Sequence, residues 1–128
     1  MPLEILQTVP ILRIFDVTKA KEFYIGFLGF QIDWEHRFDE KAPLYMQISR
    51  AGLTLHLSEH YGDGSPGATI FLRVRGLEGY HAEITAKNYG YLRPGIDSTF
   101  HNSKCMNIID PFGNRLRFDE SIEGSTTA

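Results

Sequence analysis

The spacing of apolar residues predicts a strand and then a helix near the N-terminus. Residues 9–15 are mostly apolar and β-branched, which is typical of a strand. From Thr18 onward the apolar positions change to helical spacing and fall on one stripe: Ala20, Phe23, Tyr24, Phe27 and Leu28. Asp16 or Thr18 can cap the start of this helix, and Gly29 can end it in the left-handed conformation.

The rest of the chain reads mainly as strands, with one further helix. Extended segments are expected at 30–38, 44–50, 53–59, 68–74, 104–109 and 114–119. A second helix is expected from Leu77 to about Gly90. Residues 110–114, DPFGN, suit a tight hairpin turn, because proline fixes one turn dihedral and glycine accepts a positive φ.

A faint internal repeat organises these elements. Residues 11–14 (ILRI) match 71–74 (FLRV) sixty positions later, and residues 46–48 match 106–108 at the same offset. One residue of slippage later, GLTLHLSE at 52–59 matches GNRLRFDE at 113–120. Three blocks in one order predict two copies of a module, each with a strand, a helix and further strands. The predicted fold class is therefore α+β, with the polar faces of the two copies forming a shared concavity.

Composition limits the classes of function. With 128 residues, 42% hydrophobic and 23% charged, the chain is expected to be one soluble domain over 1–128, with modules at about 5–60 and 66–120 and a frayed tail at 121–128. Thirteen basic against sixteen acidic side chains do not favour a nucleic-acid partner. No apolar run approaches the ~18 residues of a membrane span, and no signal pattern is present, so a cytoplasmic location is expected.

For several residues a functional interpretation competes with a purely structural one. The motif His56-Leu57-Ser58-Glu59-His60 resembles a zinc-peptidase pattern, but that chemistry needs a helix and this segment reads as a strand. Cys105 is the single cysteine, and a buried inert thiol is favoured over a nucleophile. Trp34, His36 and Phe38 share one strand face, opposite Asp33, Glu35 and Arg37, and form either core or a stacking surface for a planar ligand.

Together these segments resemble the vicinal oxygen chelate superfamily, and within it the glyoxalase/bleomycin-resistance group. The resemblance rests on VPILRIFDV at 9–17, EFYIGFLGF at 22–30 and DPFGNRLRF at 110–118. It implies paired βαβββ modules that curve around a cleft. It also implies a homodimer, commonly with clefts completed across the subunit boundary.

The same resemblance bears on metal chemistry. The positions that hold metal ligands in enzymes such as glyoxalase I correspond here to Val9, His56, Thr69 and Arg117. Only His56 offers a suitable donor atom, because valine has none and Arg117 is permanently cationic. No metal, cofactor or catalytic residue is therefore expected. The alternative is a metal-dependent lyase or dioxygenase of the same superfamily whose ligands include other residues, such as His36, His60 or His101.

The leading expectation is a bleomycin-resistance-like protein that sequesters a small molecule, a drug or a metabolite, without chemistry. The expected ligand-binding residues are Trp34, Phe38, Tyr45, His56, His101 and Arg117. The chain departs from the group before Asp110, where HNSKC at 101–105 replaces the usual Trp-Gly, so His101 takes the place of one stacking aromatic. A second alternative is a binding domain for an anionic metabolite, whose cleft is lined by Arg13, Arg73 and Arg117.

Overall fold

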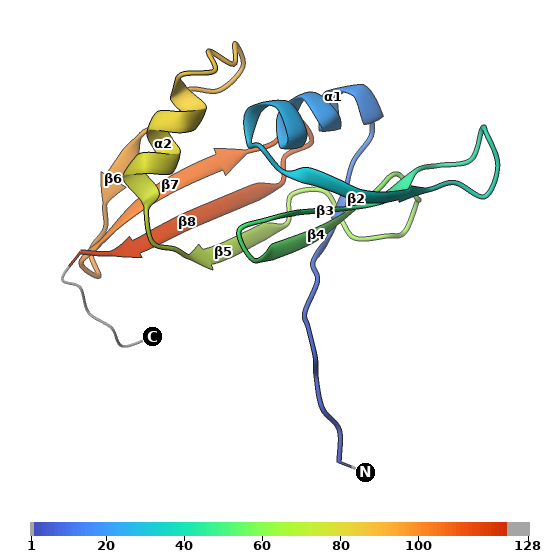
Figure 1. The fold of residues 1–128 in the computed structure, drawn as a ribbon, viewed down its shortest axis with the longest axis horizontal. Helices are drawn as coiled ribbons and strands as arrows, with labels where there is room; N and C mark the ends of the chain where they lie inside the picture. The colour runs from blue at the N-terminus through green and yellow to red at the C-terminus, as the bar shows by residue number, and fades with distance from the viewer. Residues whose placement is uncertain (1, 123–128) are drawn as a thin grey trace.

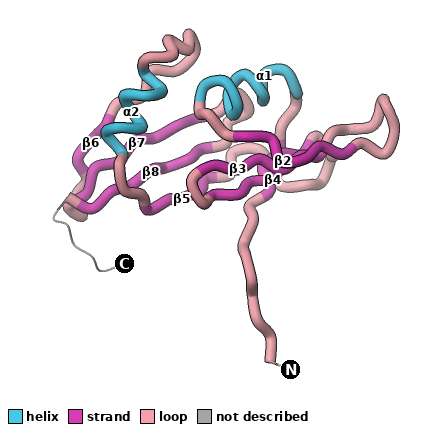
Figure 2. The backbone as a smooth tube through the Cα atoms, viewed as in Figure 1, coloured by secondary structure: helices cyan, strands magenta, loops and turns pink. Residues whose placement is uncertain are grey.

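The computed structural model describes residues 2–122, which form two four-stranded sheets with helices along one side (Figures 1 and 2). The first sheet has the strand order β1-β4-β3-β2 and the second has the order β5-β8-β7-β6. The strands are β1 (Ile11–Arg13), β2 (Gln31–His36), β3 (Tyr45–Arg50), β4 (Leu53–Ser58), β5 (Thr69–Arg73), β6 (Ile96–Ser98), β7 (Ser103–Ile109) and β8 (Arg115–Ser121). The helices are α1 (Val17–Lys21), its π-helical continuation η1 (Glu22–Phe27) and α2 (Leu77–Thr85).

The two sheets repeat one topology, which confirms the predicted α+β fold with two βαβββ modules. In each module the first strand pairs in parallel with the last, and the remaining pairs are antiparallel. Ile11 lies opposite His56 in the first sheet, and Phe71 lies opposite Arg117 in the second. These pairs are related by the sixty-residue offset and its one-residue slippage. The sequence repeat is therefore a repeat of strand register.

The first helix begins and ends as its sequence predicts. Oδ1 of Asp16 accepts a hydrogen bond from the backbone N–H of Lys19 at 2.9 Å, which caps the helix. The five residues of the predicted apolar stripe are all buried. The N–H of Leu28 reaches back five residues to the carbonyl of Phe23 at 2.9 Å, the wider π-helical bond. Gly29 follows at φ +79°, a conformation that glycine adopts without strain.

Some boundaries differ from the sequence-based expectation. The pattern did not indicate β6, because this strand has three residues, none of them buried, and no apolar alternation. The second helix ends at Thr85 instead of near Gly90, and Asn88 takes a positive φ of 52° in the turn that follows. Ser121, which was expected in the tail at 121–128, belongs to β8 instead; residues 123–128 lie outside the described part of the chain.

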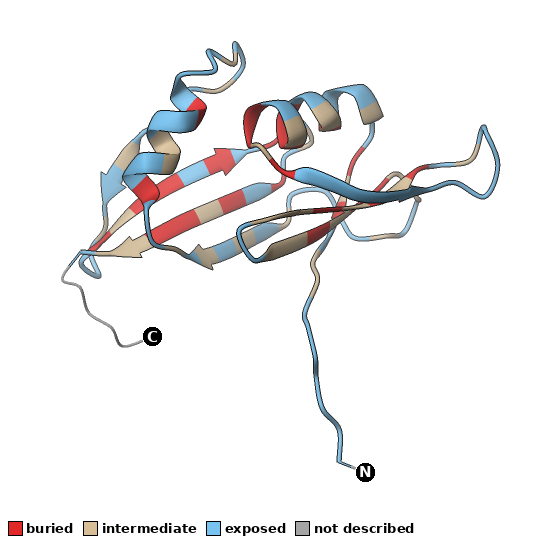
Figure 3. Cartoon of the chain, viewed as in Figure 1, coloured by how far each residue is buried: buried red, intermediate tan, exposed pale blue. Residues whose placement is uncertain are grey.

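Hydrogen bonds donated by side chains join the two modules on the helical side. Buried residues concentrate on the central strands and on the inner turns of the first helix, whereas β2 is exposed along its length (Figure 3). The hydroxyl of Tyr24 in η1 donates to Oδ2 of Asp110 in the second module at 2.7 Å. Nδ2 of Asn114 donates to the carbonyl of Arg13 at 2.9 Å. The first helix is thus anchored to the turn between β7 and β8.

The opposite surface of the sheets is not covered by helices, and we call it the open face. Along β3 and β4 the residues Met46, Ile48, Leu55 and Leu57 are buried toward the helices, so alternation turns Tyr45, Gln47 and His56 to the open face. Residues 2–10 form the N-terminal arm. Its last part contacts β4, where the N–H of His56 donates to the carbonyl of Pro10 at 2.9 Å and Nε2 of Gln7 donates to Oγ1 of Thr54 at 3.2 Å, and its first part extends away from the body of the molecule (Figure 1). No helix in residues 2–122 is long and apolar enough to span a lipid bilayer.

Candidate functional site

Three neighbouring strands bring a cluster of aromatic rings together on the open face of the first sheet. Trp34 of β2 stacks on Tyr45 of β3, with ring centroids 6.0 Å apart and planes 11° from parallel. His56 of β4 meets both rings edge-on, at 5.3 Å from Trp34 and 5.1 Å from Tyr45. His60 lies 6.3 Å from Tyr45 and 6.1 Å from Phe38. We call these five residues, together with His36, the aromatic cluster.

A β-bulge in β2 determines which residues accompany Trp34 on this face. Ile32 lies opposite Ile48, but Trp34 lies opposite Gln47, so Asp33 is an extra residue in the strand. Asp33 accepts hydrogen bonds from Nε2 of Gln47 and Oγ of Ser49, each at 3.0 Å, and these side chains belong to the open face. The expectation that Asp33 points away from Trp34 is therefore wrong, because simple alternation fails at the bulge.

The aromatic cluster borders an open cavity of about 390 Å³. Its lining consists of Trp34, His36, Phe38, Tyr45, His60 and Asp63. Trp34 is 40% exposed and Phe38 is 78% exposed, so the alternative that places these rings in the core is wrong. An exposed aromatic pair beside a cavity of this size offers a planar molecule a surface on which to stack.

Hydrogen bonds fix the orientation and the charge of His56. The hydroxyl of Tyr45 lies 2.7 Å from Nδ1 of His56, and Oε1 of Gln47 lies 3.0 Å from Nε2. Burial raises the pKa of the Tyr45 phenol and lowers the pKa of His56, so the phenol donates and the imidazole is neutral. The proton of His56 is then on Nε2, where it is donated to Gln47, and the amide of Gln47 donates in turn to Asp33.

The family positions do not make a metal site. Both ring nitrogens of His56 already have hydrogen-bond partners, so neither has a free lone pair for a metal. Val9 has no donor atom, Thr69 has only a hydroxyl, and Arg117 is cationic. In the part of the chain that the structure describes, no group of three or more His, Cys, Asp and Glu side chains is arranged to hold a metal ion.

Two of the six expected ligand-binding residues belong to the second module, Arg117 in β8 and His101 in the turn between β6 and β7. Arg117 of β8 donates from Nε to Oδ1 of Asn107 at 3.0 Å. Nε2 of His101 lies 3.3 Å from Oδ1 of Asp119, a buried carboxylate. Within residues 2–122, neither Arg117 nor His101 contacts the rings of the aromatic cluster. The structure therefore brings Trp34, Phe38, Tyr45 and His56 together and leaves His101 and Arg117 apart from them.

Other polar residues of the site were missed from the sequence. Gln47 alternates with Tyr45 along β3, so the period of the strand could have found it. Asp33 could not be found in this way, because its position depends on the bulge. Cys105 is buried, as expected, and burial is the main cause that raises the pKa of its thiol, which makes it a poor nucleophile.

Comparison with known proteins agrees with this architecture. A bleomycin-binding protein complexed with bleomycin matches with a TM-score of 0.68 and 22% identity, over 91% of this chain and 98% of that chain. A bleomycin resistance determinant encoded on the transposon Tn5 matches with a TM-score of 0.67 and 21% identity, over 90% and 97%. A glyoxalase-related enzyme from Clostridium phytofermentans matches with a TM-score of 0.71 and 18% identity, over 94% and 98%.

At these identities the structural matches establish the fold, and the sequence establishes the family. No curated protein matches this sequence. The family model described as "Glyoxalase superfamily protein" matches residues 2–125, nearly the whole chain. The resemblance to the vicinal oxygen chelate superfamily is thus confirmed, and the chain belongs to the glyoxalase superfamily.

Proposed function

We propose that the protein binds a small planar molecule, a bleomycin-type drug or an aromatic metabolite, against the aromatic cluster and sequesters it without chemistry. The observation that carries this proposal is the stacked pair of Trp34 and Tyr45 beside the open cavity. The two rings are held parallel and partly exposed, so they present a flat surface to a ligand. Because the fold already orders these side chains, binding loses little conformational entropy. The bleomycin-binding protein and the bleomycin resistance determinant share this fold, which supports a ligand of similar shape.

The charge of the site favours a cationic ligand. Hydrogen bonds from Gln47 and then Ser49 lower the pKa of Asp33, so its carboxylate is negative on the open face. Asp63 lines the cavity itself and accepts a hydrogen bond from Oγ of Ser58 at 2.8 Å. The net charge of the chain, -3, has the same sign. A planar ligand with a positive group would therefore find both stacking and charge complementarity.

The local chemistry favours binding over catalysis. His56 is the one side chain at the family's metal positions that could act as a general base, and its two nitrogens are held by Tyr45 and Gln47. A general base needs a free lone pair within hydrogen-bond reach of the substrate proton. The same two bonds make His56 a rigid edge of the stacking surface, which suits a binding site.

We also infer that a second copy of the chain completes the cleft. Leu3, Ile5 and Leu6 of the N-terminal arm are 88%, 73% and 86% exposed. Ile109 on the second sheet is 41% exposed and Phe71 is 47% exposed. Exposed apolar side chains that form one patch are typical of protein–protein interfaces. In such a homodimer, His101 and Arg117 of one copy could face the aromatic cluster of the other.

A fluorescence titration tests the proposal. Trp34 is the only tryptophan, so quenching reports directly on the aromatic cluster. Chelator-treated protein is titrated with metal-free bleomycin, and calorimetry gives the stoichiometry. Saturable quenching with one drug molecule per chain is the expected result. Absence of both quenching and heat would exclude bleomycin as the ligand. A tightly bound metal that supports lyase activity would contradict the proposal and show that the protein is an enzyme.

One observation favours a second candidate, an anionic metabolite. Arg13 and Arg73 occupy equivalent positions of the two modules, and within residues 2–122 neither forms an ion pair with a carboxylate. Their guanidinium carbons lie over aromatic rings instead, 4.6 Å from Phe15 and 5.7 Å from Phe71. Free guanidinium groups suit carboxylate or phosphate ligands. Mass spectrometry of small molecules released from denatured protein would distinguish such a ligand from a cationic one.

A further inference from the structure

A second cavity, of about 530 Å³, lies between the modules on the helical side of the sheets. It is bounded by the β3–β4 turn, by the end of β5 and by α2. Leu53 has the same parity in β4 as the buried Leu55. Leu72 of β5 lies opposite the buried Phe118 of β8. The cavity is therefore on the opposite side of the sheets from the aromatic cluster, and we call it the seam pocket.

The lining of the seam pocket is mostly apolar. Its hydrophobic side chains come from both modules: Phe30, Leu53, Leu72, Val74, Leu77, Tyr80 and Phe118. Phe30, Leu77 and Phe118 are at most 8% exposed. Sites for small molecules commonly have volumes of roughly 300–1,000 Å³ and a largely apolar lining with few polar groups. The seam pocket meets both conditions without any residue of the aromatic cluster.

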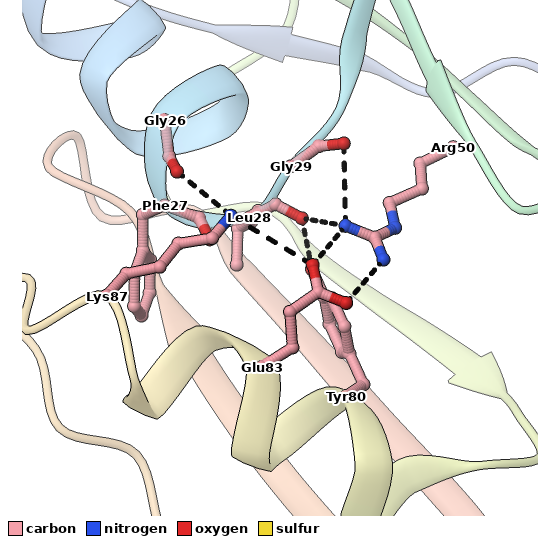
Figure 4. A network of polar contacts seen from close by, with 8 residues as sticks. All are labelled: Gly26, Phe27, Leu28, Gly29, Arg50, Tyr80, Glu83 and Lys87. Atoms are coloured by element: carbon pink, nitrogen blue, oxygen red, sulfur yellow. Dashed lines mark hydrogen bonds and ion pairs between the residues drawn. The ribbon is translucent and has the colours of Figure 1, made fainter.

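One wall of the seam pocket is held by a polar network (Figure 4). Arg50 donates to both carboxylate oxygens of Glu83, at 2.7 and 2.8 Å, and to the carbonyl of Leu28 at 3.0 Å. The hydroxyl of Tyr80 donates to the same carbonyl at 2.7 Å. Burial raises the pKa of Tyr80 to about 12, so this hydroxyl stays neutral. Arg50 and Glu83 neutralise each other, and the wall is ordered before any ligand binds.

The two other charged residues of the lining, Arg73 and Arg75, are not drawn into the interior of the pocket. The guanidinium of Arg73 lies over the ring of Phe71 on the open face, 5.7 Å from its centre. Arg75 is exposed in the bend before α2. A charged ligand would therefore lose its water shell in the pocket and gain no counter-charge from the apolar interior, whereas an uncharged ligand has no such cost.

Gly79 leaves the side of the pocket that faces α2 open. It lies within the helix and does not have a positive φ, although glycine is a poor helix former. A Cβ built on it would have no described atom within 4 Å outside its own stretch of helix, so packing does not require glycine there. Gly76 and Glu83, three positions before it and four after it, also line the pocket and share its helix face. A side chain at position 79 would thus occupy space that a ligand can fill.

We propose that the seam pocket binds an uncharged, largely apolar small molecule, held against Phe30, Leu72 and Phe118 from the two modules. The driving force is the removal of apolar surface from water, because the polar groups of the Arg50 wall already have partners. This site goes beyond the proposed function. It is separate from the aromatic cluster, and either can be correct without the other.

The test uses N-phenyl-1-naphthylamine, an uncharged probe whose fluorescence rises in an apolar environment. The wild-type chain is expected to bind it saturably. Gly79→Leu fills the pocket and should weaken binding at least ten-fold, while its urea midpoint should not fall, since leucine is the better helix former. The matched control, Ala82→Leu, adds the same side chain to an exposed position of α2 outside the pocket and should leave the affinity unchanged.

A second variant keeps the test independent of the helix. Leu53→Gln places a polar amide in the opposite wall and should also weaken binding of the probe. Trp34→Ala should leave binding unchanged, and a loss there would assign the probe to the aromatic cluster and overturn the proposal.

The charge of the ligand is tested with 8-anilinonaphthalene-1-sulfonate, which adds a sulfonate to the same ring system. It should bind no more tightly than the uncharged probe, and tighter binding of the sulfonate would overturn the uncharged class of ligand. Equal affinity of the uncharged probe for the wild type and for folded Gly79→Leu, or its failure to saturate with the wild type, would overturn the site itself.

Discussion

The two modules share a backbone arrangement but present different chemistry on the open face. In the first module Gln47 lies opposite His56, and in the second Asn107 lies opposite Arg117. Each pair forms the same cross-strand hydrogen bond, at 3.0 Å in both sheets. The two modules therefore share the strand register and this side-chain hydrogen bond, although the donor is histidine in one and arginine in the other, and the acceptor is glutamine in one and asparagine in the other.

The neighbouring positions show what the change produces. Tyr45 in β3 of the first module corresponds to Cys105 in β7 of the second, because the two positions are related by the sixty-residue offset. The first sheet therefore carries an aromatic surface with the carboxylate of Asp33 beside it, whereas the second carries Arg117 and a carboxylate, Asp119, bound to Ser103 at 2.6 Å. A duplicated scaffold thus holds two distinct surfaces, and we expect the aromatic one to determine ligand choice.

Truncation of the Trp34 side chain should give the largest loss of ligand affinity, and the loss should be specific to the first module. Trp34→Ala is expected to weaken the binding of metal-free bleomycin by about 1–3 kcal/mol, or roughly 5- to 150-fold, because a stacked aromatic anchor is lost. Calorimetry measures this, since the variant has no tryptophan fluorescence. Tyr91→Ala removes a ring from the second module that is 84% exposed, and it is the matched control. Equal losses in both variants would contradict the assignment of the site to the first module.

Exchange of His56 and Arg117, the equivalent residues of the two modules, should have the next largest effect on ligand affinity. His56→Arg places a permanent positive charge beside Trp34 and removes the acceptor of the Tyr45 hydroxyl, so binding of a cationic ligand should weaken about ten-fold. The reciprocal variant, Arg117→His, removes a positive charge that the inferred homodimer would bring toward the aromatic cluster, so binding of the same cationic ligand should not weaken. Binding that is stronger in His56→Arg would indicate an anionic ligand and favour the second candidate function.

The junction of the modules can be tested through stability. Tyr24→Phe deletes the hydroxyl that donates to the buried Asp110, and the free energy of unfolding should fall by about 1–2 kcal/mol. Urea denaturation at pH 7 measures the change. Tyr61→Phe, at a residue that is 96% exposed, should be neutral. An unchanged midpoint for Tyr24→Phe would mean that this contact does not hold the modules together.

The smallest expected effect is on the pH dependence of the free energy of unfolding. Burial lowers the pKa of His56 below its ordinary value of 6.5, so the unfolded chain binds a proton at this residue before the folded chain does. Its contribution to stability is present above pH 6.5 and is lost as the pH falls through the lower pKa of the folded state. His56→Gln should reduce the fall in stability between pH 7.5 and 5.5. An identical pH profile in both proteins would contradict the assigned environment of His56.

The sequence contained most of the fold but only part of the site. The repeat, the apolar stripe of the first helix and the glycine at its end follow from local periodicity and backbone preference. The position of Asp33 depends on a bulge, and the short β6 depends on tertiary pairing with β7. The bonds of His56 to Tyr45 and Gln47 join residues from two strands, so register as well as pattern was needed to see them.

The most direct test of the account follows the indole N–H of Trp34 by NMR during titration with metal-free bleomycin. One tryptophan gives one indole resonance, and its ring stacks on Tyr45 in the aromatic cluster. We predict that this resonance shifts and saturates together with the amide signals of Tyr45 and His56. A saturating titration that leaves the indole resonance unmoved, with shifts confined to other parts of the chain, would contradict the claim that the aromatic cluster is the binding site.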